Sequence, residues 1–331
     1  MSHLAGGAEG PWHRRVILLN PRGFCAGVVR AIDIVRIALE TFGPPVYVRK
    51  EIVHNRHVVE ELRAAGAVFV DELSEAPDGS RVVFSAHGVS PQVRREAEER
   101  NLQVIDATCP LVTKVHLEAV RFARAGHTIV LIGHHDHDEV IGTLGEAPHA
   151  TVVVSSEEDV DQLVAADATR ISYLTQTTLS LDETAGIIRR LRERFPAIEG
   201  PPASDICYAT QNRQEAVKEV ASRCDLVLVI GSKNSSNSRR LVEVAENAGA
   251  RSHLIDDASE IDPRWLDGVR LVGVTAGASA PEHLVQELLA TLRRYGFEHS
   301  EEWTVREEDV HFALPAALME ASRKLIHIAA S

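Results

Sequence analysis

The sequence predicts an α/β protein made of three similar units with mostly parallel sheets. Short runs rich in β-branched residues alternate with longer amphipathic runs of helical period, which is the pattern of strands connected by helices. The clearest strand-like runs are 15–19, 82–86, 128–133, 226–231 and 271–277. The clearest helical runs are 31–42, 211–223 and 284–296. The second observation is that three of the four cysteines have the same kind of neighbourhood.

Cys25, Cys109 and Cys207 each follow a short apolar run or its polar end, and each precedes a segment of helical period. Each cysteine is also followed by two further strand-like runs that end in polar residues. Parallel sheets place ligand-binding residues at the carboxyl ends of their strands. Three such units around a pseudo-threefold centre would therefore bring three cysteines and six polar loops together. The alternative is three unrelated α/β domains with buried cysteines, because free cysteine is often a core residue.

The cysteine positions also set the expected domain limits. We expect a disordered N-terminal extension, three α/β units and a C-terminal segment that packs back on the core. The corresponding ranges are 1–13, 14–108, 109–206, 207–300 and 301–331.

Composition excludes several classes of protein. The formal net charge is -13 and aromatic residues make up 5% of the chain, which disfavours non-specific binding to nucleic acid or anionic membranes. No apolar run is long enough for a membrane span, and the first thirteen residues lack the apolar core of a signal peptide. We therefore expect a soluble cytoplasmic protein. Four scattered cysteines without a CxxC pair predict no disulfide framework, zinc ribbon or thioredoxin-type motif.

Three thiolates without a fourth partner suit two kinds of site. One is a zinc site with three cysteine ligands and an open position. The other is a [4Fe–4S] cluster whose fourth iron has no protein ligand and can bind substrate. Cys224 lies one residue before an apolar run, a different setting from the other three cysteines, and we interpret it as structural.

Polar residues at the other strand ends predict an anion pocket. Imidazolium groups, hydroxyls, amides and backbone N–H groups at helix N-termini all bind anions such as diphosphate. The loops with glycine lack the GxxxxGK[ST] spacing of a P-loop. The candidate residues are His54, His87, His137, Ser235, Ser236, Asn237 and Ser279.

The segment GHHDHDEVIG, residues 133–142, allows two interpretations. Its histidines and carboxylates could bind a metal, although adjacent ligands rarely point the same way. Glu139, followed by Val-Ile-Gly, is better suited to a proton donor held against an apolar wall, where burial would raise its pKa towards neutrality.

Eight segments together resemble the family of 4-hydroxy-3-methylbut-2-enyl diphosphate reductases, in family order from about Val16 to about Leu314. These segments are NPRGFCAGV, EIVHN, FSAHGVS, DATCPLVTKVH, LTQTTLS, DICYAT with the following NRQ, GSKNSSNS and TAGASAP. The resemblance implies a trefoil of three α/β domains around a central [4Fe–4S] cluster with Cys25, Cys109 and Cys207 as ligands. It also implies that the seven anion-pocket residues hold the substrate diphosphate. Glu139 would relay protons, and the Thr177 hydroxyl would be its partner near the substrate alcohol.

The activity implied by the resemblance is the last step of the non-mevalonate isoprenoid pathway. (E)-4-hydroxy-3-methylbut-2-enyl diphosphate loses its hydroxyl by two-electron reduction to give isopentenyl and dimethylallyl diphosphate. Reduced ferredoxin or flavodoxin would supply the electrons.

The histidine-rich segment and the N-terminal extension depart from the family pattern. His134 or His135 could share the role given to His137, although the register two residues before Glu139 favours His137. Rival interpretations are a hydro-lyase with a substrate-binding cluster iron, an iron–sulfur sensor and a zinc enzyme. A hydro-lyase would need no external electrons, and a sensor would need a partner-binding module that no motif here supplies.

Overall fold

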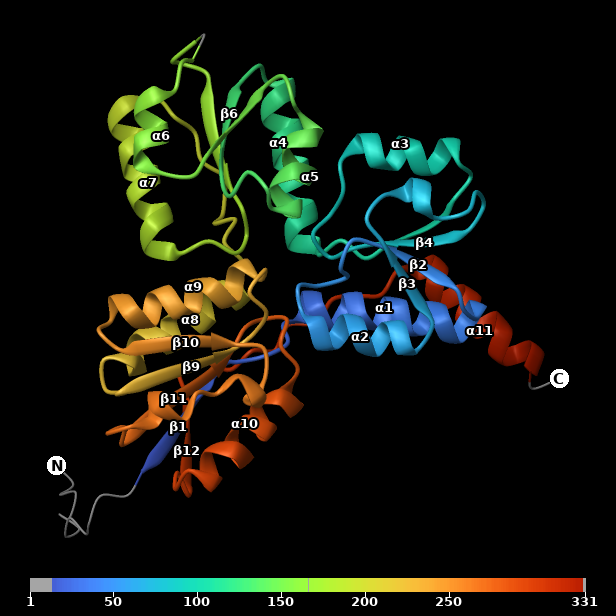
Figure 1. Ribbon diagram of the computed structural model, residues 1–331. Coiled ribbons are helices and arrows are strands. Elements are labelled where there is room, and N and C mark those ends of the chain that lie inside the picture. The colour runs from blue at the N-terminus through green and yellow to red at the C-terminus, as the bar shows by residue number, and fades with distance from the viewer. Residues whose placement is uncertain (1–13, 166, 330–331) are drawn as a thin grey trace.

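The computed structural model describes residues 14–165 and 167–329, which fold into three α/β lobes around a common centre (Figure 1). Within these residues the strands form three sheets, and every strand pair in them is parallel. The predicted fold class is therefore confirmed. The expected extension at residues 1–13 lies outside the described part of the chain.

The first lobe contains a four-stranded sheet in the order β3-β2-β4-β5. Its core forms because α1 places small and branched side chains at helical spacing, among them Ala31, Val35 and Ala38, against Val46 and Val48 of the sheet. The elements are α1 (Ala26–Phe42), β2 (Val46–Arg49), α2 (Arg56–Ala64), β3 (Ala67–Val70), η1 (Leu73–Glu75), β4 (Arg81–Phe84), α3 (Pro91–Glu99) and β5 (Gln103–Asp106).

The second lobe contains a three-stranded sheet in the order β7-β6-β8. β8 is buried along its whole length, as expected for a strand covered on both faces. Beside it, Glu199 forms an isolated parallel bridge to Ser172. The elements are α4 (Pro110–Arg124), β6 (Thr128–Ile132), α5 (Asp138–Glu146), β7 (Thr151–Val154), α6 (Glu157–Gln162), β8 (Ile171–Thr175) and α7 (Leu181–Arg194).

The third lobe contains a five-stranded sheet in the order β10-β9-β11-β1-β12. Its strands β9 and β11 are buried apolar runs, matching the sequence pattern that predicted them. The elements are β1 (Arg15–Asn20), α8 (Tyr208–Ala221), β9 (Leu226–Ile230), α9 (Ser236–Asn247), β10 (Arg251–Ile255), η2 (Ala258–Glu260), η3 (Pro263–Leu266), β11 (Leu271–Ala276), α10 (Glu282–Arg294) and β12 (His299–Thr304).

The three lobes share one strand order. In each sheet the strands lie in the spatial order second, first, third, fourth: β3-β2-β4-β5 in the first lobe, β7-β6-β8 beside Glu199 in the second, and β10-β9-β11-β1 in the third. The repeat is circular, because β1 begins the described chain but fills the fourth position of the last unit. In every lobe a cysteine follows this fourth position.

β1 therefore joins a different sheet from the one implied by the expected unit 14–108. Val16 is in register with Val272 of β11 and with Ser300 of β12. β12 also crosses the expected limit at residue 300, while the following α11 (Ala316–Ala329) packs against α1 and contributes Leu318 to the first core. A short apolar run predicts a strand, but it does not indicate which sheet that strand joins. The domain limits themselves stay a prediction.

Candidate functional site

Each of the three cysteines stands at the N-cap of a helix: Cys25 before α1, Cys109 before α4 and Cys207 before α8. The backbone N–H of each one donates to a carbonyl in the loop that follows the third strand of the preceding unit. These carbonyls belong to Ala278 (3.1 Å), Ala86 (3.0 Å) and Thr177 (3.0 Å), respectively. One local geometry thus occurs three times and directs three thiols to one place.

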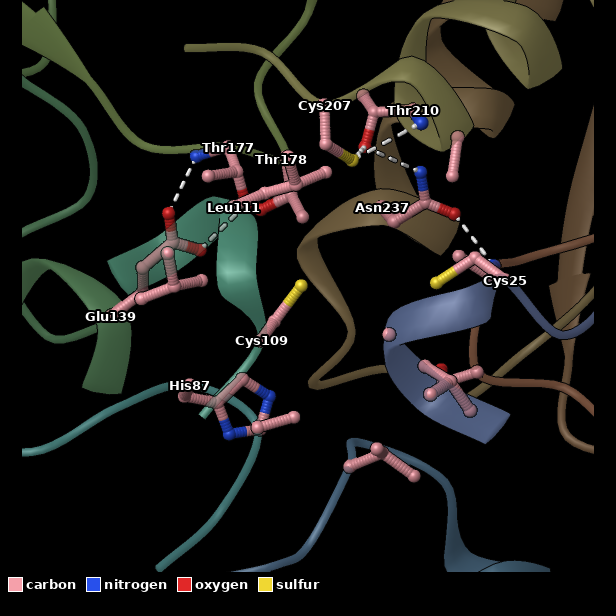
Figure 2. A pocket seen from close by; sticks show the side chains of 18 of the residues that line it. Cys25, His87, Cys109, Leu111, Glu139, Thr177, Thr178, Cys207, Thr210 and Asn237 are labelled. Atoms are coloured by element: carbon pink, nitrogen blue, oxygen red, sulfur yellow. Dashed lines mark hydrogen bonds between the residues drawn. The ribbon is translucent and has the colours of Figure 1, made fainter. Parts of the chain in front are cut away.

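The three cysteine side chains line a single pocket at the centre of the lobes, and Figure 2 shows their sulfur atoms facing the same space. Close approach depends on Gly27 in the first turn of α1. A Cβ atom on this residue would lie 2.7 Å from Sγ of Cys109 and 3.8 Å from Sγ of Cys25. We call the space between the three cysteine sulfurs and Gly27 the cradle. It stays open because Gly27 has no side chain.

The electrostatics of the pocket favour a positively charged occupant beside the cysteines. Burial raises the pKa of Cys109 to about 12 and that of Cys207 to about 11, and repulsion between the neighbouring sulfurs adds to both shifts. Thiolates at this position need a cationic centre, because a metal ion keeps coordinating thiols deprotonated. The donor set therefore fits a metal centre with three sulfur ligands. Cys224 lies elsewhere, in the core between α8 and β9.

His54, His87 and His137 form a compact cluster on the same pocket. The rings of His54 and His87 stack with centroids 4.0 Å apart, and His137 meets them edge-on at 5.4 and 5.8 Å. The backbone N–H of Glu139 donates to Nδ1 of His137 (3.2 Å), so the neutral ring carries its proton on Nε2.

Two rings of the histidine cluster have lowered pKa values, and an acidic side chain, Glu51, lies 3.0 Å from Nδ1 of the third, His54. Burial lowers the pKa of His87 well below its usual value and that of His137 to about 3, with repulsion from His54 as the next cause in both cases. An anion placed among these rings would raise both pKa values, because opposite charge favours the protonated form.

The N-terminus of α9 supplies further anion-binding groups. Ser235 is the N-cap, and Ser236 and Asn237 form the first turn, where backbone N–H groups and the helix dipole favour negative charge. Asn237 accepts from the backbone N–H of Ala278 (2.8 Å). Ser279 donates to the carbonyl of His54 (2.8 Å) and so joins this loop to the histidine cluster.

Glu139 and Thr177 form a buried pair between the histidines and Cys207. One carboxylate oxygen accepts from the backbone N–H of Thr177 (2.6 Å) and the other from its hydroxyl (3.0 Å) (Figure 2). Burial nevertheless raises the pKa of Glu139 to about 7, which is the condition for a proton donor near neutral pH. The Thr177 carbonyl accepts from Cys207, so this residue connects the acid to a cysteine loop.

One pocket thus contains every residue for which the sequence predicted a catalytic, substrate-binding or metal-ligand role. His134 and His135 instead line an adjoining hollow, where the His134 ring contacts Arg240. Of the metal-ligand candidates in residues 134–139, Asp138 has a carboxylate oxygen within 4.8 Å of ring nitrogens of His54 and His87.

Sequence reasoning missed several residues that line the pocket. Thr210 contacts Sγ of Cys207 through its backbone N–H (3.4 Å) and its hydroxyl (3.2 Å), and Asn237 donates to that hydroxyl (3.2 Å). The helix start at Cys207 signals Thr210, since a residue three positions after an N-cap faces it. Nothing in the sequence signals Phe312, which reaches the pocket from the C-terminal segment.

The helices of the described residues include none with the length and apolar character needed to cross a membrane.

Comparison of sequences shows that residues 16–293 match the family described as LytB protein. The 4-hydroxy-3-methylbut-2-enyl diphosphate reductase of Acidothermus cellulolyticus is 59% identical over 306 residues, which cover 92% of this chain and 90% of that protein. The enzyme of the same name from Nocardia farcinica is 58% identical over 311 residues, covering 94% and 93%.

Solved structures lead to the same group. The E-1-hydroxy-2-methyl-but-2-enyl-4-diphosphate reductase of Plasmodium falciparum superposes with a TM-score of 0.92 at 39% identity, over 95% of this chain and 99% of the other. A structure described as (E)-4-hydroxy-3-methyl-but-2-enyl diphosphate reductase, the terminal enzyme of the non-mevalonate pathway, gives a TM-score of 0.60 at 31% identity over 85% and 99%.

The histidine cluster predicts that anion binding takes up protons. At neutral pH the free cluster is mostly uncharged at His87 and His137, and a bound anion raises their pKa values. Affinity for inorganic diphosphate should therefore fall as the pH rises from about 6 to about 8. Calorimetry in buffers of different ionisation enthalpy measures the proton uptake directly.

Inorganic diphosphate also changes its protonation in this pH range, and the His137→Ala variant controls for that change. It should take up fewer protons and bind roughly 10-fold to 150-fold more weakly, the range of a charged hydrogen bond. Equal proton uptake by this variant and the wild type would contradict the assignment.

Proposed function

The chain belongs to the LytB protein family, and on this premise we propose that it reduces (E)-4-hydroxy-3-methylbut-2-enyl diphosphate to isopentenyl and dimethylallyl diphosphate. The reaction takes two electrons and two protons, and the hydroxyl group leaves as water. One observation carries the proposal beyond the family name: a single pocket combines three cysteines, a cluster of anion-binding groups and a buried acid. These are the parts that a reductive dehydroxylation of a diphosphate requires.

A [4Fe–4S] cluster is the group that we assign to Cys25, Cys109 and Cys207. The three converging sulfurs and the space kept by Gly27 support this assignment. When bound, such a cluster supplies electrons and, at the iron without a protein ligand, a Lewis-acidic position for the substrate oxygen. Reduced ferredoxin or flavodoxin is the external electron source that we propose.

The protein's first contribution is to hold the diphosphate. His54, His87 and His137 line the pocket together with the N-terminus of α9 and Ser279, and we assign the diphosphate to these groups. Anchoring one end of the substrate fixes the direction of its C–O bond and raises the effective concentration of the reacting groups. Burial of the histidines also excludes water from the bound anion.

The second contribution is to deliver a proton to the departing oxygen. When Glu139 is protonated, its O–H donates to the Thr177 hydroxyl oxygen 3.0 Å away. The Thr177 hydroxyl hydrogen is then free to turn towards the substrate, because a hydroxyl both donates and accepts. The pKa of about 7 keeps a substantial share of Glu139 protonated at neutral pH.

The metal assignment predicts that anaerobically isolated protein contains about four irons and four sulfides per chain. Serine at position 25, 109 or 207 removes a ligand and should abolish stable loading. Cys224→Ser is the matched control and should leave the iron content close to wild type, because this thiol lies in the core of the third lobe. Stoichiometric zinc without iron, or loss of iron in the control alone, would refute the assignment.

Gly27→Ala tests the shape of the cradle without removing a ligand. Alanine is the better helix former by about 1 kcal/mol, yet its Cβ would meet Sγ of Cys109 at 2.7 Å. We expect lost or weakened iron binding in a chain that still folds, measured by iron content together with thermal unfolding. Full iron loading would show that the cysteine sulfurs do not need this approach.

Glu139→Gln tests proton delivery. The amide keeps the size and hydrogen bonding of the acid, so iron content and substrate KM should change little. Turnover with dithionite-reduced viologen should fall by about 10²–10⁴, the usual value of general acid catalysis. In the wild type, turnover should decline as the pH rises through about 7, because the proton is then lost from Glu139.

The exposed neighbouring carboxylate of Asp136 provides the control, and Asp136→Asn should turn over normally. Near-normal turnover of Glu139→Gln would place the proton source elsewhere. Turnover without any reductant would instead favour a hydro-lyase.

A further inference from the structure

A segment without helix or strand crosses the centre of the molecule after the third sheet. We call residues 305–315 the strap. It begins where Val305 donates to the carbonyl of Asn20 (3.0 Å) and ends at α11. Figure 1 shows it passing from β12 in the third lobe to α11 beside the first lobe.

The strap forms one wall of the cysteine site. Cys25, Tyr208 and Phe312 line both the central pocket and a second cleft on its outer side. These three residues therefore form the wall that separates the central pocket from the outer cleft. The outer cleft is also lined by Glu308 and Val310 of the strap.

A buried arginine fastens the strap at this point. Arg213 of α8 is fully buried, and its guanidinium donates to Glu308 (3.0 Å), to the carbonyl of Gly23 (2.7 Å) and to the carbonyl of Ala209 (2.9 Å). Asn212 donates to the same Glu308 oxygen (2.9 Å). One side chain thus joins the helix that begins at Cys207, the loop that leads to Cys25 and the strap.

A second arginine repeats the connection on the other side. Arg30 of α1 donates to the carbonyl of Ala313 in the strap (2.8 Å) and to the carbonyl of Thr108 (3.0 Å), the residue before Cys109. The two arginines therefore connect the strap to the segments next to all three pocket cysteines: Gly23 before Cys25, Thr108 before Cys109, and the helix that follows Cys207. By contrast, Arg306 of the strap forms an exposed ion pair with Glu215 at 3.4 Å.

We propose that the strap shields the Cys25 side of the metal centre and that the Arg213–Glu308 pair holds it closed. Arg213 and Glu308 are then positioning residues: they act through Gly23 and Phe312 on the exposure of Cys25 and of whatever it binds. This ion pair is costly to break, because the fully buried charge of Arg213 is then left without its partner. The protection of a metal centre rests on the proposed function, whereas the contacts that hold the strap do not depend on it.

The test measures access to the site rather than turnover alone. In anaerobic holoenzyme, a ferrous chelator should withdraw iron from Glu308→Ala roughly tenfold faster or more, the effect of losing a charged hydrogen bond on an opening equilibrium. Glu308→Gln keeps the shape but not the charge and should lie between this variant and the wild type. Arg306→Ala, which removes an exposed ion pair on the same strap, should behave as wild type.

Alkylation of the cluster-free full chain provides the second readout. In Glu308→Ala, maleimide should modify Cys25 faster by a similar factor, whereas the rate at Cys109 should change little. If Glu308→Ala does not fold, the same two measurements on Glu308→Gln decide the question. Wild-type rates in folded Glu308 variants, equal acceleration by Arg306→Ala, or equal acceleration at all cysteines would overturn the proposal.

The two readouts separate this proposal from the proposed function. If the wild type bound no iron, the metal assignment would fail, and the cysteine alkylation rates would still report whether the strap shields Cys25.

Discussion

The structure depends on bringing three cysteine sulfur atoms to one pocket. Thiols in that pocket resist ionisation, because burial and mutual repulsion raise the pKa of Cys109 and Cys207 far above the usual value. The fold meets this demand by repetition: each cysteine caps a helix and donates its N–H to the loop after a neighbouring strand. All three lobes have the same strand order, and β1 completes the last lobe.

The pocket also separates two opposite charges. The cysteine end favours a cationic centre, and the histidine end, where burial and repulsion hold the pKa values low, favours an anion. Glu139 lies between the two ends, and its own burial keeps it ready to carry a proton. Burial is the largest cause of the pKa shifts of the cysteines, the histidines and Glu139. The proposed chemistry uses these three kinds of group in different ways.

The sequence predicted the fold class because alternating strand and helix patterns are local properties. It also indicated the cysteines, histidines and Glu139, because ends of parallel strands gather at one edge of a sheet. It did not reveal that β1 joins the last sheet, since partner choice is made by tertiary packing. Phe312 and the contact of Arg213 with Glu308 were equally hidden, because they connect segments far apart in the chain and carry no periodic pattern.

In the proposed function, three cysteines hold an iron–sulfur centre that meets the substrate at an iron without a protein ligand. Mössbauer spectroscopy of protein loaded with ⁵⁷Fe, recorded with and without the allylic diphosphate, tests it most directly. We predict that substrate shifts the signal of one iron of four and leaves the other three nearly unchanged. A spectrum that does not respond to bound substrate, or four irons that are equivalent before and after its addition, would contradict the account.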